Sequence, residues 1–371
     1  MHDIIIVGSG PAGTAAALQL AGGDVLLLDA GFTSPKIPKN FCGDLYHLRK
    51  KELNLFPSLV GDNFESLANL FTDKKINLKL KSPYMSYIIR NWKMLSHIDS
   101  TSFEGVVSLA KGGLANAWGA GVFRYTDEDL KEFPISYVDL EPYYDRLTEH
   151  VGISGVNDDL SPWFQQDKGL LPPIRLCGMA ADLMERYIAA REFFNTEGIF
   201  MGLARLAVLT VKHRGRAPYA YDHMEFFRPN IEAIYTPAFT LDELVCEGRV
   251  TYNPGWLVER FEEIDGGVQV CARPVNGGEA SFFKCRKLLL GAGALNTARI
   301  VLASARDNVT LLPIMDNPMS CFPVFRLDRL GRVIEPEDAS VGQLNIIYEG
   351  EEDVGTVQGS FMAPMALYAR M

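Results

Sequence analysis

Three glycines near the start of the chain have a spacing that can hold a phosphate. An apolar, β-branched run ends at Val7, and an alanine-rich stretch typical of a helix begins a few residues later. In a strand–turn–helix unit the first glycine permits the tight turn, the second lets the backbone approach a pyrophosphate, and the third lets the helix pack on the strand. Unpaired N–H groups at the start of the helix attract an anion. The residues that would form this phosphate site are Gly8, Ser9, Gly10, Pro11, Ala12 and Gly13.

An acidic residue follows at the position where a ribose would lie. A second apolar strand, Val25 to Leu28, ends in Asp29 and Ala30, and Asp29 stands about twenty residues after the glycines. A carboxylate there accepts hydrogen bonds from a ribose diol. A glycine-rich turn alone also occurs for structural reasons, but strand, glycines, helix, strand and acid appear here in order. These residues predict a dinucleotide site and leave FAD and NAD open, because both place a pyrophosphate on this turn.

A second glycine-rich segment occupies residues 108–130. It contains Gly112 and Gly113, followed by Asn116, Ala117 and Trp118. The backbone of such a loop can lie flat against a planar or charged ligand. Farther on, the sequence predicts a turn beginning at Ser136, an amphipathic helix over 140–151 and an apolar strand over 206–211.

Composition and charge exclude several classes of protein. A chain of 371 residues exceeds one ordinary core, so we expect two lobes. The net charge is −10 and no dense basic run occurs, which argues against a nucleic-acid surface. Six cysteines are scattered singly, without the pairs typical of zinc or disulfide frameworks, so no metal site is predicted. The apolar runs are too short to span a bilayer and no secretion signal is evident, which predicts a cytoplasmic protein.

Four segments resemble the glucose-methanol-choline (GMC) family of flavoprotein oxidoreductases and its sugar-oxidising relatives. They are GSGPAG with LLLDAG, the Gly112-Gly113 loop, DLEPYYDR…VGISG, and VTYNPGWLVERFEE…KLLLGAGALNTARIVLAS at 250–304. The resemblance covers most of residues 1 to about 315, in the order of the family. It implies an α/β fold, with a Rossmann-like FAD-binding domain and a discontinuous second, substrate domain built on an antiparallel sheet.

The resemblance also implies which residues hold FAD, without a covalent bond. The first glycine loop would hold the pyrophosphate and Asp29 the adenosine ribose. Val258 matches the residue whose backbone meets adenine, although ordinary sheet core is the alternative. Four residues would lie along the pyrophosphate and isoalloxazine ring, namely Gly112, Gly113, Asn116 and Ala117. Two small residues would pass close to the cofactor, Ala292 and Gly293.

The positions of the flavin-like segments predict the domain organisation. The FAD-binding domain would comprise residues 1–34, 102–130 and 200–314. The substrate and lid domain would comprise residues 35–101, 131–199 and 315–371. Alternating residues after Asp316, including GQLNIIYEG, predict antiparallel strands in the substrate sheet. The final residues GSFMAPMALYARM predict the start of an amphipathic helix.

The chain departs from the family in its histidines. GMC enzymes carry a catalytic histidine in a C-terminal segment, whereas the six histidines here are His2, His47, His97, His150, His213 and His223. We therefore name no catalytic residue, and expect the base to come from a segment beyond residue 371 or from a partner subunit. His213 and His223 could border a substrate pocket, but a surface or structural role is favoured. Arg214 and Arg216 could receive an anionic group, or could simply be solvated.

The predicted function is that of an FAD-dependent oxidoreductase. It would remove a hydride from an alcohol carbon of a small, sugar-like or polyol substrate and pass the electrons to an unspecified acceptor. The alternative is an FAD-binding subunit or non-catalytic homologue that a partner completes. NAD-linked dehydrogenation is a weaker alternative, because it explains the first thirty residues and not the Gly112-Gly113 loop.

Overall fold

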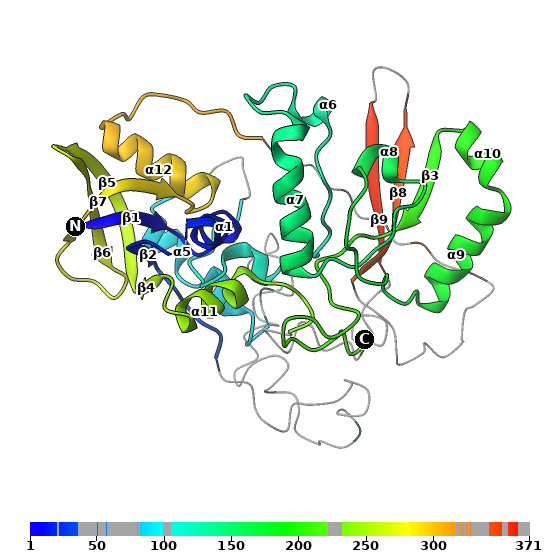
Figure 1. Ribbon diagram of the computed structural model, residues 1–371, viewed down its shortest axis with the longest axis horizontal. Helices are drawn as coiled ribbons and strands as arrows, with labels where there is room; N and C mark the ends of the chain where they lie inside the picture. Colours follow the sequence, from blue (N-terminus) through cyan, green and yellow to red (C-terminus); the bar gives the residue numbers. More distant parts are fainter. Residues whose placement is uncertain are drawn as a thin grey trace.

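Two sheets organise the described part of the chain in the computed structural model (Figure 1). The structure describes residues 1–20, 22–35, 82–98, 105–221, 232–315, 341–350 and 355–362, with seven isolated positions between them. The larger sheet has the strand order β4-β2-β1-β7-β6-β5, and the smaller has the order β3-β8-β9. The protein is therefore mixed α/β, with one parallel-rich sheet and one antiparallel sheet.

The parallel part of the larger sheet carries the opening motif. Strand β1 (His2–Val7) lies between β2 (Val25–Asp29) and β7 (Ser281–Leu290), and β4 (Thr251–Pro254) extends the sheet beyond β2. All four strands are parallel, so their carboxyl ends meet at one edge. Helix α1 (Pro11–Leu20) follows β1, as the glycine spacing predicts.

Side chains of β1 and β2 alternate between two buried layers, as strand geometry requires. Ile6 and Leu27 pack with helices α1 and α11 (Pro237–Cys246) on one face. Ile5 and Leu28 pack on the other face with β5 (Trp256–Ile264), β6 (Gly267–Pro274) and helix α12 (Ala294–Ala305). Both faces are covered, which explains why these strands read as continuous apolar runs.

Strand β7 joins the antiparallel and parallel parts of the larger sheet. Its first half pairs antiparallel with β6, and its second half pairs parallel with β1. Cys285 is the residue that pairs with both neighbours, Val268 and His2. The strand then ends at Leu290, and residues 291–293 lead into α12.

The smaller sheet consists of β3 (Ile199–Leu203), β8 (Gly342–Glu349) and β9 (Thr356–Met362). Strand β8 confirms the antiparallel strand predicted from GQLNIIYEG. Helix α9 (Gly178–Ala189) covers this sheet through Tyr187, which packs with Met201 and Leu344. Strand β3 straddles the predicted boundary at residue 200 and pairs with β8, while the division into two domains itself stays a prediction.

Helix α7 (Tyr137–Val151) stands between the two sheets in the view of Figure 1. Ser136 and Asp139 form a capping box at its start, so Ser136 caps the helix directly and the helix begins at Tyr137, earlier than the predicted 140. The helix ends at Gly152, whose φ is +78°. The remaining short helices are η2 (Ser86–Ile89), α5 (Trp92–Ser96), η3 (Gly113–Asn116), α6 (Asp127–Leu130), α8 (Ser161–Phe164) and α10 (Arg191–Thr196).

Two local predictions are wrong. Residues 206–211 form no continuous strand: Leu206 bridges Gly121 and Ser154, and Val208 bridges Ile234. These partners come from separate loops, so each pairing is a single residue long. The residues GSFM, predicted to begin a helix, belong to β9, where Phe361 pairs with Leu344. The rest of that predicted helix lies outside the described residues.

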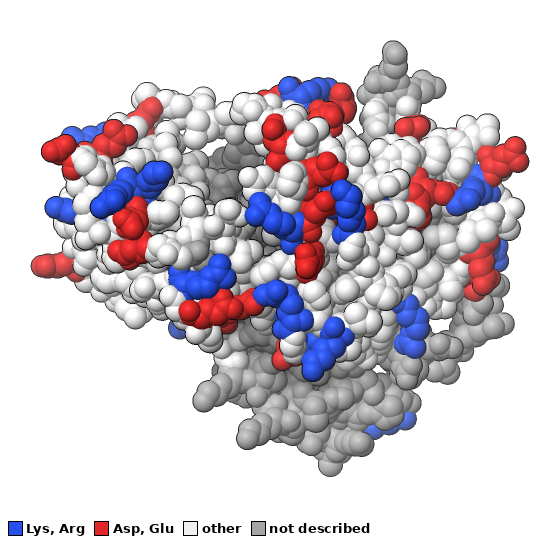
Figure 2. All heavy atoms as spheres, in the orientation of Figure 1, with Lys and Arg blue, Asp and Glu red and all other residues white. Residues whose placement is uncertain are grey.

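Charged side chains of both signs are interspersed over the face drawn in Figure 2, so this face carries no field of a single sign. No helix among the described residues is both long and apolar enough to cross a membrane.

Candidate dinucleotide-binding site

The first and third glycines of the opening motif are required by close packing. Gly8 has a φ of +94°, and a Cβ atom there would lie 2.5 Å from the carbonyl oxygen of Gly291. A Cβ atom on Gly13 would lie 1.9 Å from the carbonyl oxygen of Gly8. Any side chain at either position would therefore push apart the strand, the helix and the 291–293 loop. These are the packing roles that the motif assigns to its outer glycines.

Gly10 is different, because a Cβ atom there would meet nothing within 4 Å. The next two residues, Pro11 and Ala12, are exposed at the start of α1. Proline suits the first helical position, where an N–H group would have no helical partner. The loop is thus tight on its inner side and open on its outer side, where the N-terminal N–H groups of α1 can receive an anion.

The second glycine-rich loop lies directly against the first. A Cβ atom on Gly113 would be 3.2 Å from the Cα atom of Gly10. The N–H group of Gly112 donates to Ser9 Oγ at 3.0 Å. Both glycines have positive φ, +92° and +63°, so the loop conformation itself favours glycine. Two segments a hundred residues apart in the sequence are therefore adjacent in the structure.

Asn116 and Ala117 end this second loop. The Asn116 amide donates to the carbonyl oxygens of Lys111, at 2.9 Å, and Gly113, at 2.8 Å. Its oxygen accepts from the Thr236 hydroxyl at 2.8 Å. Asn116 thus fixes the shape of the loop and ties it to the start of α11, a role the sequence did not indicate. Ala117 is half-buried at the end of η3.

Asp29 is buried at the carboxyl end of β2, with 8% of its surface exposed. Its Oδ2 atom accepts hydrogen bonds from the Ser9 hydroxyl and, at 3.0 Å, from the Tyr252 hydroxyl. Burial raises the pKa of Asp29 to about 6, and the hydrogen bonds from Ser9 and Tyr252 limit the rise. Ser9, itself 1% exposed, accepts from Gly112 and donates to Asp29, so it links the two glycine loops to the acid.

The sequence analysis missed Tyr252, a neighbour of Asp29, and Lys111, which lies over the Tyr252 ring. The Lys111 ammonium lies 5.3 Å from the centre of the Tyr252 ring and forms an ion pair with Asp242 of α11. Tyr252 belongs to VTYNPG, a segment singled out for its family resemblance and not for this side chain. The parallel pairing of β4 with β2 is what brings its hydroxyl to Asp29.

The turn between β4 and β5 closes the site beside Ala30. The N–H group of Gly255 donates to the carbonyl oxygen of Ala30 at 3.2 Å. Val258 is 3% exposed and packs in the core with Ile5. Its carbonyl oxygen accepts from Arg299 at 2.8 Å. The placement of Val258 agrees with the alternative of ordinary sheet core, and an adenine contact stays a prediction.

The loop after β7 completes the arrangement. Gly291 lies against Gly13, so closely that a Cβ atom there would be 2.7 Å from the Gly13 nitrogen. Ala292 is half-buried, and Gly293 is exposed with a φ of +81° and open space around it. Five chain segments therefore meet at the carboxyl edge of the parallel strands: 8–13, 29–31, 109–117, 252–258 and 291–293.

The candidate polar residues near His213 have partners within the protein. His213 Nε2 lies 2.8 Å from the carbonyl oxygen of Glu149, and Arg214 forms an ion pair with Glu243. Arg216 donates to the carbonyl oxygen of Val151. For His213 this contact agrees with the structural role that the sequence favoured. Arg214 and Arg216 are held by protein groups and are not simply solvated. His223 lies outside the described residues.

Comparison with known proteins gives one weak relative. No family model matches the chain. The large subunit of fructose dehydrogenase from Gluconobacter japonicus is 25% identical over 181 residues, which make up 43% of this chain and 29% of that protein. The chain therefore spans less than a third of the length of this curated relative.

Solved structures with detectable similarity are distant. The anhydrotetracycline hydroxylase OxyS from Streptomyces rimosus has 13% identity and a TM-score of 0.23, over 78% of this chain and 31% of that chain. The halogenase PltM has 14% identity and a TM-score of 0.24, over 80% of this chain and 35% of that chain. The amino acid oxidase NikD has 12% identity and a TM-score of 0.22, over 79% of this chain and 51% of that chain. At these scores the matches do not define a shared overall fold.

Proposed function

We propose that this chain binds FAD non-covalently and forms the cofactor-binding part of an oxidoreductase. The reaction would remove a hydride from an alcohol carbon of a small, sugar-like or polyol molecule. The observation that carries the proposal is the meeting of five segments at the carboxyl edge of the parallel strands, where Gly113 lies directly against Gly10. A NAD site would require the first glycine loop and Asp29, but it would leave the second glycine loop without a role.

The residues of the site fit the parts of FAD. The first loop and the start of α1 offer backbone N–H groups to the pyrophosphate, and Gly10 leaves room for its approach. Asp29 would bind the adenosine ribose, and Gly112 with Gly113 would lie along the rest of the cofactor. Ala117 has no nucleophilic group, which agrees with non-covalent binding. When bound, FAD supplies the hydride acceptor.

The weak relative supports the substrate class and the idea of a partner. It is named as a fructose dehydrogenase, an oxidoreductase acting on a sugar, and as a large subunit. We therefore extend the proposal to a sugar-like alcohol and to a possible partner subunit. The cytoplasmic location and the two-domain division are parts of the same proposal.

A second candidate is a protein that binds FAD without catalysing a reaction by itself. The observation that favours it is the engagement of His213, Arg214 and Arg216 in protein contacts, so none of these three described residues is assigned as a base. Alcohol oxidation needs a group that takes the hydroxyl proton. Such a group would then come from a partner.

Anaerobic titration separates the two candidates. The purified protein is mixed under argon with a panel of sugars and polyols, and the visible flavin absorbance is followed. Bleaching by one member of the panel would establish alcohol oxidation. Persistent absorbance with every member, alone and with any co-purifying partner, would contradict the oxidoreductase and favour the binding subunit.

A further inference from the structure

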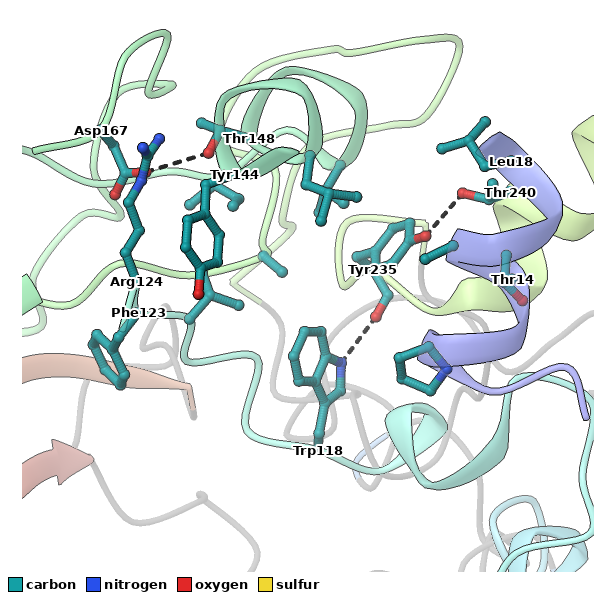
Figure 3. A pocket seen from close by; sticks show the side chains of 17 residues that line it. Thr14, Leu18, Trp118, Phe123, Arg124, Tyr144, Thr148, Asp167, Tyr235 and Thr240 are labelled. Carbon is teal, nitrogen blue, oxygen red and sulfur yellow. Dashed lines mark hydrogen bonds and ion pairs between the residues drawn. The ribbon is translucent and has the colours of Figure 1, made fainter. Parts of the chain in front are cut away.

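A cavity of about 240 Å³ lies between helices α1 and α7, beside the dinucleotide site (Figure 3). It begins at Pro11, the residue after Gly10, and runs along Leu18 of α1 and Leu147 of α7. Figure 3 shows Trp118 and Tyr144 at one side of it and Thr14 and Leu18 at the other. The walls are thus mostly aliphatic and aromatic side chains.

The polar side chains that line the cavity bond to the protein. The Thr14 hydroxyl donates to the carbonyl oxygen of Ser9 at 2.9 Å, and the hydroxyls of Tyr235 and Thr240 lie 2.8 Å apart. The Thr148 hydroxyl donates to Asp167 at 3.3 Å.

Arg124 is the cation among the described lining residues, and its charge is neutralised by acidic side chains. Arg124 is 4% exposed and forms ion pairs with Asp145, at 2.7 Å, and with Asp167. A ligand inside the cavity would therefore meet apolar surface and little free hydrogen-bonding capacity. A charged group or a polyol would lose its hydration there without regaining hydrogen bonds, which is unfavourable.

The aromatic walls are held in place before any ligand binds. The indole N–H of Trp118 donates to the carbonyl oxygen of Tyr235 at 2.9 Å. The guanidinium of Arg124 stacks over the Tyr144 ring at 5.5 Å from its centre. Because these rings are already fixed, less side-chain conformational entropy is lost when a ligand binds.

We propose that this cavity is a binding site for a small, uncharged molecule built on an aromatic ring system. An apolar cavity of about 150 Å³ stays dry and binds benzene, so the space here suits two fused rings. The site adjoins the dinucleotide loop through Pro11 and is distinct in chemistry from a site for a sugar-like substrate. The inference does not depend on FAD binding, because Pro11 apart, no described lining residue is among those assigned to the cofactor.

Isothermal titration of the 371-residue protein with 2-naphthalenemethanol tests the proposal, with sorbitol as the polar comparison. We expect saturable binding of the naphthalene compound and none of sorbitol. Leu147→Trp fills the cavity from α7 and should weaken binding by at least about tenfold. Val138→Trp is the matched control, since Val138 lies on the same helix, is 71% exposed and is outside the cavity lining.

A second variant, Ala15→Phe, fills the cavity from α1, where Ala15 is exposed. It keeps the test decisive if Leu147→Trp does not fold, which circular dichroism will show. Binding that is absent in the unmodified protein, or that persists in a folded cavity-filling variant, would overturn the proposal, as would tighter binding of sorbitol. Flavin content is recorded separately by absorbance, so failure of the proposed FAD function is distinguishable from failure of this site.

Discussion

Replacing Asp29 with asparagine should change how the stability of the flavin-free protein depends on pH. Burial raises the pKa of Asp29 from 3.8 to about 6 in the folded state. Between these values the folded state holds a proton that the unfolded state has released, so the group's contribution to stability falls as pH rises. At 1.36 kcal/mol per pKa unit, the contribution of Asp29 falls by about 1.4 kcal/mol between pH 5 and pH 7.5.

Asparagine cannot titrate, so Asp29→Asn removes this component of the pH dependence. Its amide oxygen can still accept from Ser9 and Tyr252, and any constant cost of the amide group cancels when two pH values are compared. Urea denaturation of both proteins at pH 5 and pH 7.5 measures the quantity. The variant should gain about 1.4 kcal/mol relative to the parent on going to the higher pH. Parallel pH dependences would refute the burial argument for Asp29.

Three further outcomes follow from the packing of the site. Gly13→Ala should lower the free energy of unfolding by about 1–3 kcal/mol or more, because its Cβ would collide with Gly8. Gly10→Ala should leave the melting temperature nearly unchanged and weaken dinucleotide binding. Equal melting temperatures for the two variants would contradict the packing account. Ser9→Ala should lower the free energy of unfolding by about 1–3 kcal/mol, since it leaves the buried Gly112 N–H without its acceptor. Urea titrations measure this change, and an unchanged urea midpoint would count against that hydrogen bond. Asp29→Ala should weaken FAD binding by about 1.5–3 kcal/mol in fluorescence titrations, and unchanged affinity in a folded variant would assign Asp29 a structural role.

The opening of the fold could be predicted because its signals are local. Glycine spacing, two apolar runs and the acid at the end of β2 lie within thirty residues, and their order together indicates one strand–turn–helix–strand unit. The prediction of a strand over 206–211 was wrong because short apolar runs occur both in buried strands and in buried loops. Cross-strand pairing with β8 decided the conformation of residues 359–362, and no local signal reveals that partner.

The site residues that could be predicted also have local roles, and those that could not are placed by distant segments. The glycines could be placed from sequence because their roles are set by their own backbone and nearest neighbours. Tyr252 could not, since its hydroxyl reaches Asp29 across 223 residues of chain through strand pairing. The link from Thr236 to Asn116 was hidden for the same reason. The ionisation of Asp29 also depends on burial by these distant segments, which the sequence does not display.

The most direct test of the account is the flavin content of the purified 371-residue protein. The protein is saturated with FAD, freed of excess ligand by gel filtration, and examined by visible absorbance before and after acid precipitation. The account predicts a yellow protein that releases its flavin to the supernatant, and loss of the colour in a folded Gly10→Val variant. A colourless protein, or flavin that stays with the precipitate, would contradict it.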